Sequence, residues 1–223
     1  MNRSFMNLPH EFIAKRASLE LQDGETLNLG KGIPWLVNQF IPPGIEVMLL
    51  EEVGQLAFFR PLVSAEGDLP GNDKREGVPS RTLASCFFSV DEALVMIRGG
   101  HLDLAIMDAD EVDESGNLAN WMVPGRKVQG VGALMDLAVG AKRVVLAMEH
   151  KTKDQKPRIQ RNCRLPLTAL GVVKRIITEM AVLDVTPDGL LLREIAPGFS
   201  VDEVTRSTEA EIRVDKDLKI IQV

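Results

Sequence analysis

Short apolar segments alternate with segments of helical pattern along most of this chain of 223 residues. Strands are predicted at 26–29, 47–50, 84–88, 102–107 and 144–148. Helices are predicted at 7–22, 34–40, 131–139 and 172–179, and another begins at a capping box of Ser89 and Glu92 and ends at Gly99. Strands separated by helices form a mostly parallel open sheet with helices on both faces, and the chain is therefore predicted to have an α/β fold.

The C-terminal part departs from this alternation. Segments 181–185 and 190–195 flank Pro187-Asp188-Gly189, which predicts an antiparallel hairpin. Ser200 and Glu203 repeat the capping box before a last helix and a C-terminal strand. Residues 54–80 combine glycine, proline and charge over a length typical of a binding loop or a poorly ordered segment. We see no internal repeat or linker, and we expect residues 1–223 to form a single domain.

Composition and charge exclude several classes of function. The net charge of −6 and pI near 5.2 argue against nucleic acid as the partner. The locally basic segment 151–164 has no aromatic residues, which favours a solvated loop, although a phosphate-bearing cofactor could use it. Without a signal sequence or an apolar run long enough to span a membrane, the protein is expected to be cytoplasmic and soluble. Cys86 and Cys163 have neither metal-ligand nor redox-motif spacing, and we expect two reduced, buried thiols.

Two adjacent glutamates, Glu51 and Glu52, follow the predicted strand at 47–50 and precede a glycine turn at Gly54. Open α/β sheets bind ligands at the carboxyl ends of their strands, where a carboxylate can take part in chemistry. Paired acids at strand ends are more often solvated loop residues. The pair alone also does not show which of the two glutamates would act.

Other motifs do not predict a site. The segment 30–34 (GKGIP) begins like a dinucleotide fingerprint but lacks its third glycine and has proline where the helix should open. The acidic segment 108–114 fails the calcium-loop template, because it lacks the required glycine and the final glutamate. The histidines stand singly, which argues against a catalytic triad or a zinc site, and no metal is expected. His150 ends a predicted strand, where a capping or surface role is favoured.

Several longer segments closely resemble the β subunit of the family I coenzyme A transferases, which act on short 3-oxoacids such as acetoacetate or 3-oxoadipate. The similarity covers nearly the whole chain, and the NLANW block at 117–121 is its most specific part. The segments that carry it are 28–34 (NLGKGIP), 97–103 (IRGGHLD), 116–126 (GNLANWMVPGR), 135–144 (MDLAVGAKRV), 165–168 (LPLT), 184–189 (DVTPDG) and 196–198 (APG).

This resemblance implies a reaction. The family's Glu-x-Gly motif maps onto Glu52-Val53-Gly54, which makes Glu52 the nucleophile rather than Glu51. Its carboxylate would attack an acyl-CoA, pass through an acyl-glutamyl anhydride and form a glutamyl-CoA thioester. Coenzyme A would be a co-substrate and not a bound cofactor. The backbone candidates for stabilising the oxyanions or binding substrate are Gly30, Gly32, Gly54 and the segment Gly130, Val131 and Gly132. A separate α subunit is implied as partner, in an α2β2 or larger assembly.

The chain departs from the family pattern near this site. Glu51 and Val53 replace smaller or polar residues, and the apolar segment 55–59, which includes Phe58, follows in place of small residues. Ala133 replaces a glycine and would strain the oxyanion loop if its φ had to be positive. Asp108 and Glu111 add charge and Ser89 replaces an aspartate. Added negative charge would repel an acid substrate unless a nearby cation neutralised it, and Lys31 is the candidate for that cation.

These departures leave two alternatives to an active transferase subunit. One is a CoA-thioester hydrolase or ring-cleaving enzyme of the same fold that does not use Glu52 as nucleophile. The other is a non-catalytic partner subunit. Glu51, Lys31 and Glu111 are the residues expected to tune Glu52 or contact coenzyme A.

Overall fold

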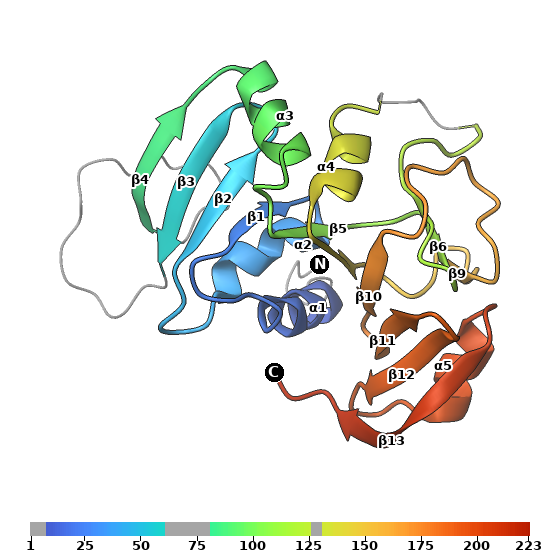
Figure 1. Ribbon diagram of the computed structural model, residues 1–223. Coiled ribbons are helices and arrows are strands. Elements are labelled where there is room, and N and C mark those ends of the chain that lie inside the picture. Colours follow the sequence, from blue (N-terminus) through green and yellow to red (C-terminus); the bar gives the residue numbers. More distant parts are fainter. Residues whose placement is uncertain (1–7, 61–80, 126–130) are drawn as a thin grey trace, which may run out of the picture.

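The computed structural model describes residues 8–60, 81–125 and 131–223, and in these residues ten strands form one mixed sheet (Figure 1). In sheet order these are β13 (Ile212–Ile220), β12 (Gly189–Ile195), β11 (Ala181–Thr186), β10 (Val173–Ile177), β8 (Arg143–Ala147), β5 (Leu104–Met107), β1 (Thr26–Leu29), β2 (Val47–Glu51), β3 (Gln55–Arg60) and β4 (Arg81–Phe87).

The centre of the sheet is parallel, antiparallel pairs extend it at both ends, and the edge strand β13 pairs parallel with β12. Strands β10, β8, β5, β1 and β2 each run parallel to the next. The predicted hairpin is present as the antiparallel pair β11 and β12. This confirms the predicted α/β fold with a mostly parallel sheet and a late hairpin. The antiparallel pairs β2–β3 and β3–β4 at the other end are not predicted.

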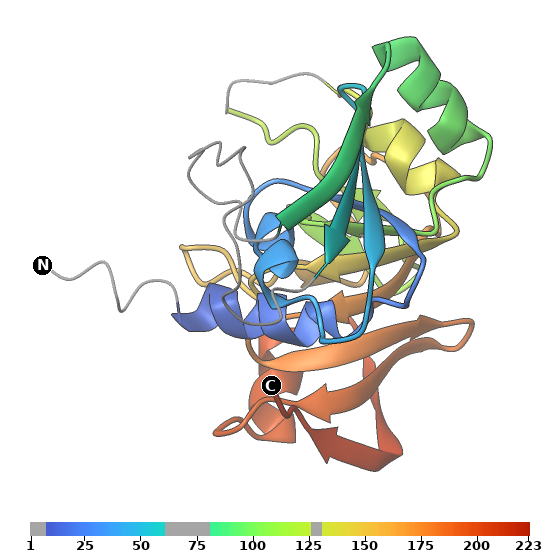
Figure 2. The same cartoon turned by 90° about the vertical axis from the view of Figure 1, so that its left-hand side faces the viewer.

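Helices cover both faces of the sheet, as predicted (Figures 1 and 2). On one face lie α1 (Leu8–Ser18) and α2 (Ile33–Leu36), which continues into the 3-10 helix η2 (Val37–Phe40). On the other lie α3 (Val90–Arg98) and α4 (Leu134–Gly140). Strand β5 shows how one segment serves two cores, because Leu104 and Ile106 pack in the α1 and α2 cluster while Ala105 and Met107 pack in the α3 and α4 cluster.

Both predicted capping boxes are present. The Ser89 hydroxyl accepts the Glu92 N–H at 3.2 Å and the Glu92 carboxylate accepts the Ser89 N–H at 2.8 Å, which opens α3. Ser200 and Glu203 make the same pair of bonds before α5 (Val201–Ser207). Each box satisfies N–H groups that the first helical turn leaves without a partner.

Two predicted elements are wrong. The segment expected to be a helix at 172–179 is strand β10, where a bulge between Val173 and Arg175 breaks the two-residue alternation. The segment expected to be a long loop at 54–80 begins with strand β3, which pairs with β2 across a tight turn. The remainder of that segment, 61–80, lies outside the described residues.

A second, three-stranded sheet lies beside the carboxyl ends of β5 and β8. It consists of β7 (Leu118–Ala119), β6 (Glu111–Asp113) and β9 (Ile159–Gln160). Arg158 ties it to the main sheet, because its guanidinium donates to Asp108 and to the Ala109 carbonyl after β5 and to the Glu149 carbonyl after β8.

Candidate active site

Glu52 lies in the tight turn between β2 and β3. The turn is closed by the Gly54 N–H, which donates to the Glu51 carbonyl at 3.0 Å. Gly54 has φ of +95°, and a Cβ on it would lie 2.2 Å from the Phe88 carbonyl oxygen. Only glycine fits this position without strain. The turn therefore holds Glu52 at the carboxyl end of β2, the edge at which the parallel strands β1, β5, β8 and β10 also end.

Asn28, in the middle of β1, binds the Glu52 side chain directly. Its amide nitrogen donates to the Leu50 carbonyl at 2.9 Å and to Oε2 of Glu52 at 3.2 Å. Asn28 is buried, and it lies between two leucines that pack in the α1 and α2 cluster, so its side chain is on the α3 and α4 face. It is not among the residues predicted from the sequence. The signal is a polar residue in the apolar strand TLNL, one strand away from the glutamate pair.

Glu51 takes the opposite side of β2. Leu49 packs in the α1 and α2 cluster and Leu50 in the other, so alternation directs Glu51 towards α1 and α2. Its side chain is half-buried, and burial together with the nearby charge of Glu52 raises the pKa of Glu51. The two adjacent carboxyl groups therefore occupy different environments.

The candidate glycines differ in whether their backbone N–H groups are already hydrogen-bonded within the chain. Gly30 donates its N–H to the Ile106 carbonyl at 2.9 Å, and that of Gly54 is bound within the turn. Gly32, with φ of +81° at the start of α2, and Gly132, with φ of +52° before α4, have no acceptor for their N–H groups within the described parts of the chain. Gly130 lies outside the described residues.

The loop before α4 is on the same face as Glu52, because α4 begins near the carboxyl edge and packs in the cluster that contains Leu50. Val131 accepts the Leu134 N–H at 3.1 Å and helps to start the helix. Ala133 caps the helix with φ of −90°, a value that alanine adopts freely. The replacement of glycine by Ala133 therefore does not strain this loop.

A family model described as Coenzyme A transferase matches residues 10–207 of the chain. The chain belongs to the coenzyme A transferase family. It is 44% identical over 207 residues to the B subunit of a probable succinyl-CoA:3-ketoacid coenzyme A transferase of Bacillus subtilis (strain 168), which covers 92% of this chain and 95% of that protein. It is 40% identical over 207 residues to the beta subunit of the acetate CoA-transferase of Escherichia coli (strain K12), covering 92% and 94%.

Solved structures agree on the fold. The acyl-CoA transferase YdiF of E. coli O157:H7, in a thioester complex with CoA, has a TM-score of 0.69 at 22% identity, over 96% of this chain and 43% of that one. The predicted family is confirmed, and the α/β fold is that of known coenzyme A transferases.

Asp108 and Glu111, the two acidic residues expected to add charge near the site, have structural partners. Asp108, just after β5, accepts from Arg158 at 2.9 Å and from the Ala109 N–H at 2.8 Å. Glu111 accepts the N–H groups of Arg164 and Leu165 at 2.7 and 3.0 Å.

The charge of Asp108 is met by Arg158, at 2.9 Å, and not by Lys31. Lys31 is exposed and forms no ion pair with any residue that the structure describes. Its expected action on Glu52 or on a bound acid stays a prediction.

One histidine is buried in the core, and the two cysteines differ in exposure; Cys86 lies on β4 opposite Leu56, beside the Glu52 turn. His150 is fully buried and its ring nitrogens bond the hydroxyls of Thr178 at 3.0 Å and Thr208 at 2.8 Å. The expected capping or surface role of His150 is therefore wrong. Cys86 is exposed, which contradicts the expectation of two buried thiols, while Cys163 is half-buried.

Neither a metal cluster nor a membrane helix is found in the described residues. Among residues 8–60, 81–125 and 131–223, no three His, Cys, Asp or Glu side chains are grouped so that they could hold a metal ion. None of the helices in these ranges is long and apolar enough to cross a membrane.

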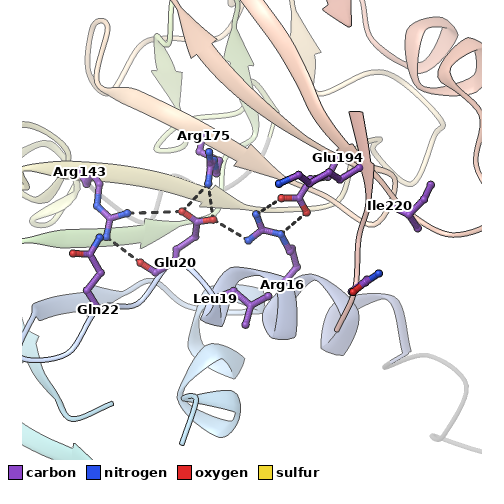
Figure 3. A pocket seen from close by; sticks show the side chains of 10 residues that line it. Arg16, Leu19, Glu20, Gln22, Arg143, Arg175, Glu194 and Ile220 are labelled. Atoms are coloured by element: carbon purple, nitrogen blue, oxygen red, sulfur yellow. Dashed lines mark hydrogen bonds and ion pairs between the residues drawn. The ribbon is translucent and has the colours of Figure 1, made fainter. Parts of the chain in front are cut away.

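A charged pocket lies at the opposite edge of the parallel strands, where β8 begins (Figure 3). Glu20 is buried, and its carboxylate accepts from Arg16 at 2.8 Å and from Arg175 at 2.8 and 3.1 Å. Arg143 donates to the Glu20 backbone carbonyl at 3.0 Å and lies 3.8 Å from its carboxylate. Arg16 also bonds Glu194 twice at 2.7 Å. The guanidinium groups are thus engaged by carboxylates of the chain, and the network joins α1 to β8, β10 and β12.

Proposed function

We propose that this chain is the β subunit of an acid CoA-transferase that moves coenzyme A between an acyl-CoA and a short 3-oxoacid through a glutamyl-CoA thioester on Glu52. The observation that carries the proposal is the hydrogen bond of Asn28 to Oε2 of Glu52 in a turn that glycine alone can form. One oxygen of the carboxylate is held, and the other can attack. Family membership supplies the reaction class.

The chemistry divides one exchange into covalent steps. Glu52 attacks the acyl-CoA carbonyl, and coenzyme A leaves as its thiolate, which gives a mixed anhydride. The thiolate attacks the glutamyl carbon, the first acid leaves as a carboxylate, and a glutamyl thioester remains. A second acid reverses the sequence. The acyl carbonyl develops negative charge in these steps, and Gly32 and Gly132, whose N–H groups have no acceptor among the described residues, are the proposed backbone donors to it.

The proposal includes a partner and a substrate class. The B. subtilis and E. coli relatives are each designated as one subunit of a transferase. We therefore propose that this chain acts with a separate α subunit, in an α2β2 or larger assembly, with coenzyme A as co-substrate. The 3-oxoacid is proposed first, because the relative at 44% identity is designated a succinyl-CoA:3-ketoacid transferase. Acetate, from the designation of the E. coli relative, is the competing acid.

Trapping of the intermediate tests the proposal. The chain is purified with its α partner, loaded with succinyl-CoA or acetoacetyl-CoA, and treated with borohydride or hydroxylamine. We expect peptide mass spectrometry to locate the modification on Glu52, to find none in Glu52→Ala, and to find it still on Glu52 in Glu51→Gln. Exchange assays with acetoacetate and acetate then define the acid.

Other outcomes identify the alternatives. Turnover retained in Glu52→Gln, or thioester loss without an acceptor acid, would show an enzyme that does not use Glu52 as nucleophile. Binding of CoA esters without exchange would show a non-catalytic subunit. Full activity of the chain alone would overturn the proposed α partner.

A further inference from the structure

We propose that Asn28 stabilises the oxyanion that forms on Glu52 itself when its glutamyl carbon is attacked. This inference rests on the proposed function, in which Glu52 becomes an anhydride and then a thioester. Asn28 would then be a catalytic residue that touches a reacting atom and would not serve only to orient the side chain.

The geometry fixes which atom Asn28 presents to Glu52. Both neighbours of its amide group, the Leu50 carbonyl and Oε2 of Glu52, are acceptors, at 2.9 and 3.2 Å. Only the NH2 end of an asparagine can serve two acceptors, one with each hydrogen. The bond to the Leu50 carbonyl anchors the amide to the β2 backbone, and the second N–H is thereby aimed at Oε2.

The surroundings keep this donor in place and free of water. Asn28 is 2% exposed and lies within β1, which is paired with β2 on one side and with β5 on the other. A donor fixed by the sheet needs no reorganisation when charge appears on its acceptor, and its interaction with that charge is strengthened where water is excluded. A donor on a flexible loop would lack both properties.

The chemistry gives this hydrogen bond a role in each half of the cycle. After Oε1 of Glu52 has attacked the acyl-CoA, Oε2 is the remaining glutamyl carbonyl oxygen of the anhydride. The coenzyme A thiolate attacks the glutamyl carbon, a C–S bond forms, and the negative charge moves from sulfur to Oε2. The bond between that carbon and Oε1 then breaks, the charge leaves with the acid as a carboxylate, and Oε2 is a carbonyl oxygen again. Attack by the second acid on the thioester places charge on the same oxygen.

This assignment separates two oxyanions that must be stabilised in different places. The acyl carbonyl of the substrate lies outside the Glu52 side chain and needs donors from the surrounding loops. The glutamyl carbonyl belongs to the enzyme, and Asn28 is already bonded to one of its oxygens before substrate binds.

The test measures the reactivity of the glutamyl thioester after it has formed. The wild-type chain, Asn28→Ala and Asn28→Asp, each with the α partner, are loaded with acyl-CoA, freed of excess substrate by gel filtration and exposed to hydroxylamine. Hydroxylamine attacks the same glutamyl carbon and forms the same oxyanion. We expect both variants to react on the order of 10² to 10³ times more slowly than wild type, the loss found for single oxyanion donors. Asn28→Asp keeps the size of the side chain but removes the donor, and should lose as much as Asn28→Ala.

Asn38→Ala is the matched control. Asn38 is buried to a similar extent at 3% exposed, and neither polar atom of its amide has a hydrogen-bond partner in the described residues. It therefore removes a buried amide without touching Glu52, and we expect a wild-type rate of reaction with hydroxylamine. Thermal unfolding of all variants shows whether either Asn28 variant fails to fold, in which case the other is used.

The outcomes distinguish this inference from the proposed function. If the wild-type chain forms no thioester on Glu52, the proposed function fails. If wild type forms it and the preformed thioester of the Asn28 variants reacts at the wild-type rate, the inference is overturned and the proposed function stands. If the Asn28 variants form the thioester slowly but the formed thioester reacts with hydroxylamine at the wild-type rate, Asn28 only orients the carboxylate. That result also overturns the inference.

Discussion

A methyl group at Gly54 would displace the turn that carries Glu52. In Gly54→Ala the new Cβ would lie 2.2 Å from the Phe88 carbonyl oxygen, well inside the 3.0 Å below which real contacts essentially never occur. The turn or the start of α3 must then move by about 1 Å. Alanine would also have to adopt φ of +95°, a left-handed value that costs about 1–2 kcal/mol. Overpacking against backbone adds about 1–3 kcal/mol, and we expect the free energy of unfolding to fall by about 2–5 kcal/mol in total.

Two other glycines provide the control. Gly24 and Gly44 have similar φ values of +79° and +84°, and a Cβ on either would meet nothing within 4 Å. Gly24→Ala and Gly44→Ala therefore carry only the backbone strain of about 1–2 kcal/mol. Urea unfolding of the three variants, compared at equal m values, isolates the contribution of the Phe88 contact.

The displacement of the Glu52 turn in Gly54→Ala should also lower the rate of CoA exchange. Moving a reacting group by about 1 Å costs roughly a hundredfold in rate, and we expect a loss of that order in exchange activity for Gly54→Ala. The Gly24 and Gly44 variants, which lie outside the site, should keep the activity of wild type once folded. If Gly54→Ala had the stability and activity of Gly24→Ala, the close approach of this turn to Phe88 would be refuted.

Three further predictions concern titration, the charged pocket and thiol reactivity. Burial lowers the pKa of His150 from 6.5 to about 4. Between these pH values the unfolded chain binds a proton at His150 and the folded chain does not, so the free energy of unfolding should fall by roughly 3 kcal/mol as the pH drops from 6.5 to 4. Urea unfolding measures the free energy of unfolding of wild type and of His150→Gln across this pH range, and the difference between the two profiles is the contribution of His150. The same pH dependence in both proteins would contradict the prediction. Glu20→Gln leaves buried guanidinium charge without its shared carboxylate and should destabilise the chain at the low end of about 3–5 kcal/mol. The same method measures this loss, with the exposed Glu211→Gln as surface control. Iodoacetamide should label exposed Cys86 and spare Cys163, because burial and nearby acids raise the pKa of the Cys163 thiol to about 12; labelling of Cys163 in the folded chain would argue against this.

Elements whose signals are local were predictable from the sequence. The strands β1, β2 and β8 and both capping boxes depend on short apolar runs or on a Ser and a Glu at a fixed spacing. The hairpin of β11 and β12 follows from its turn residues. In each case the physical cause lies within about ten residues of chain, and no tertiary contact overrides it.

Strand β10 shows where local pattern misleads. Val173, Ile176 and Ile177 repeat at helical spacing, and that spacing predicts a helix. In the structure Ile176 packs in one cluster and Ile177 in the other, as in a strand buried on both faces, and the bulge after Val173 shifts the alternation. The β-branched residues favour a strand, but the bulge depends on pairing with β8, which the segment alone does not reveal.

Strand β3 could have been predicted from the sequence, but the glycine, proline and charge of residues 61–80 led to the prediction of a single loop at 54–80. The sequence from 47 to 60 reads as two apolar runs joined by Glu52-Val53-Gly54, which is typical of a hairpin with glycine at the position of positive φ. The proline and charge that begin after it belong to a different segment. Recognition of the hairpin would have placed Glu52 in a tight turn and brought Phe58 onto a strand beside Met48.

The choice between the two glutamates depends on geometry that neither residue shows alone. Alternation along β2 sends them to opposite faces, and on the α3 and α4 face the buried amide of Asn28, one strand away, donates to Glu52. A nucleophilic carboxylate must stay charged and must keep one oxygen free, and a single fixed N–H meets both requirements. Glu51, whose pKa is raised by burial, is less suited to carry that charge. The family motif and the packing of the sheet therefore support the proposal of Glu52 as nucleophile for independent reasons, the first from sequence and the second from the position of an asparagine that the pair itself does not indicate.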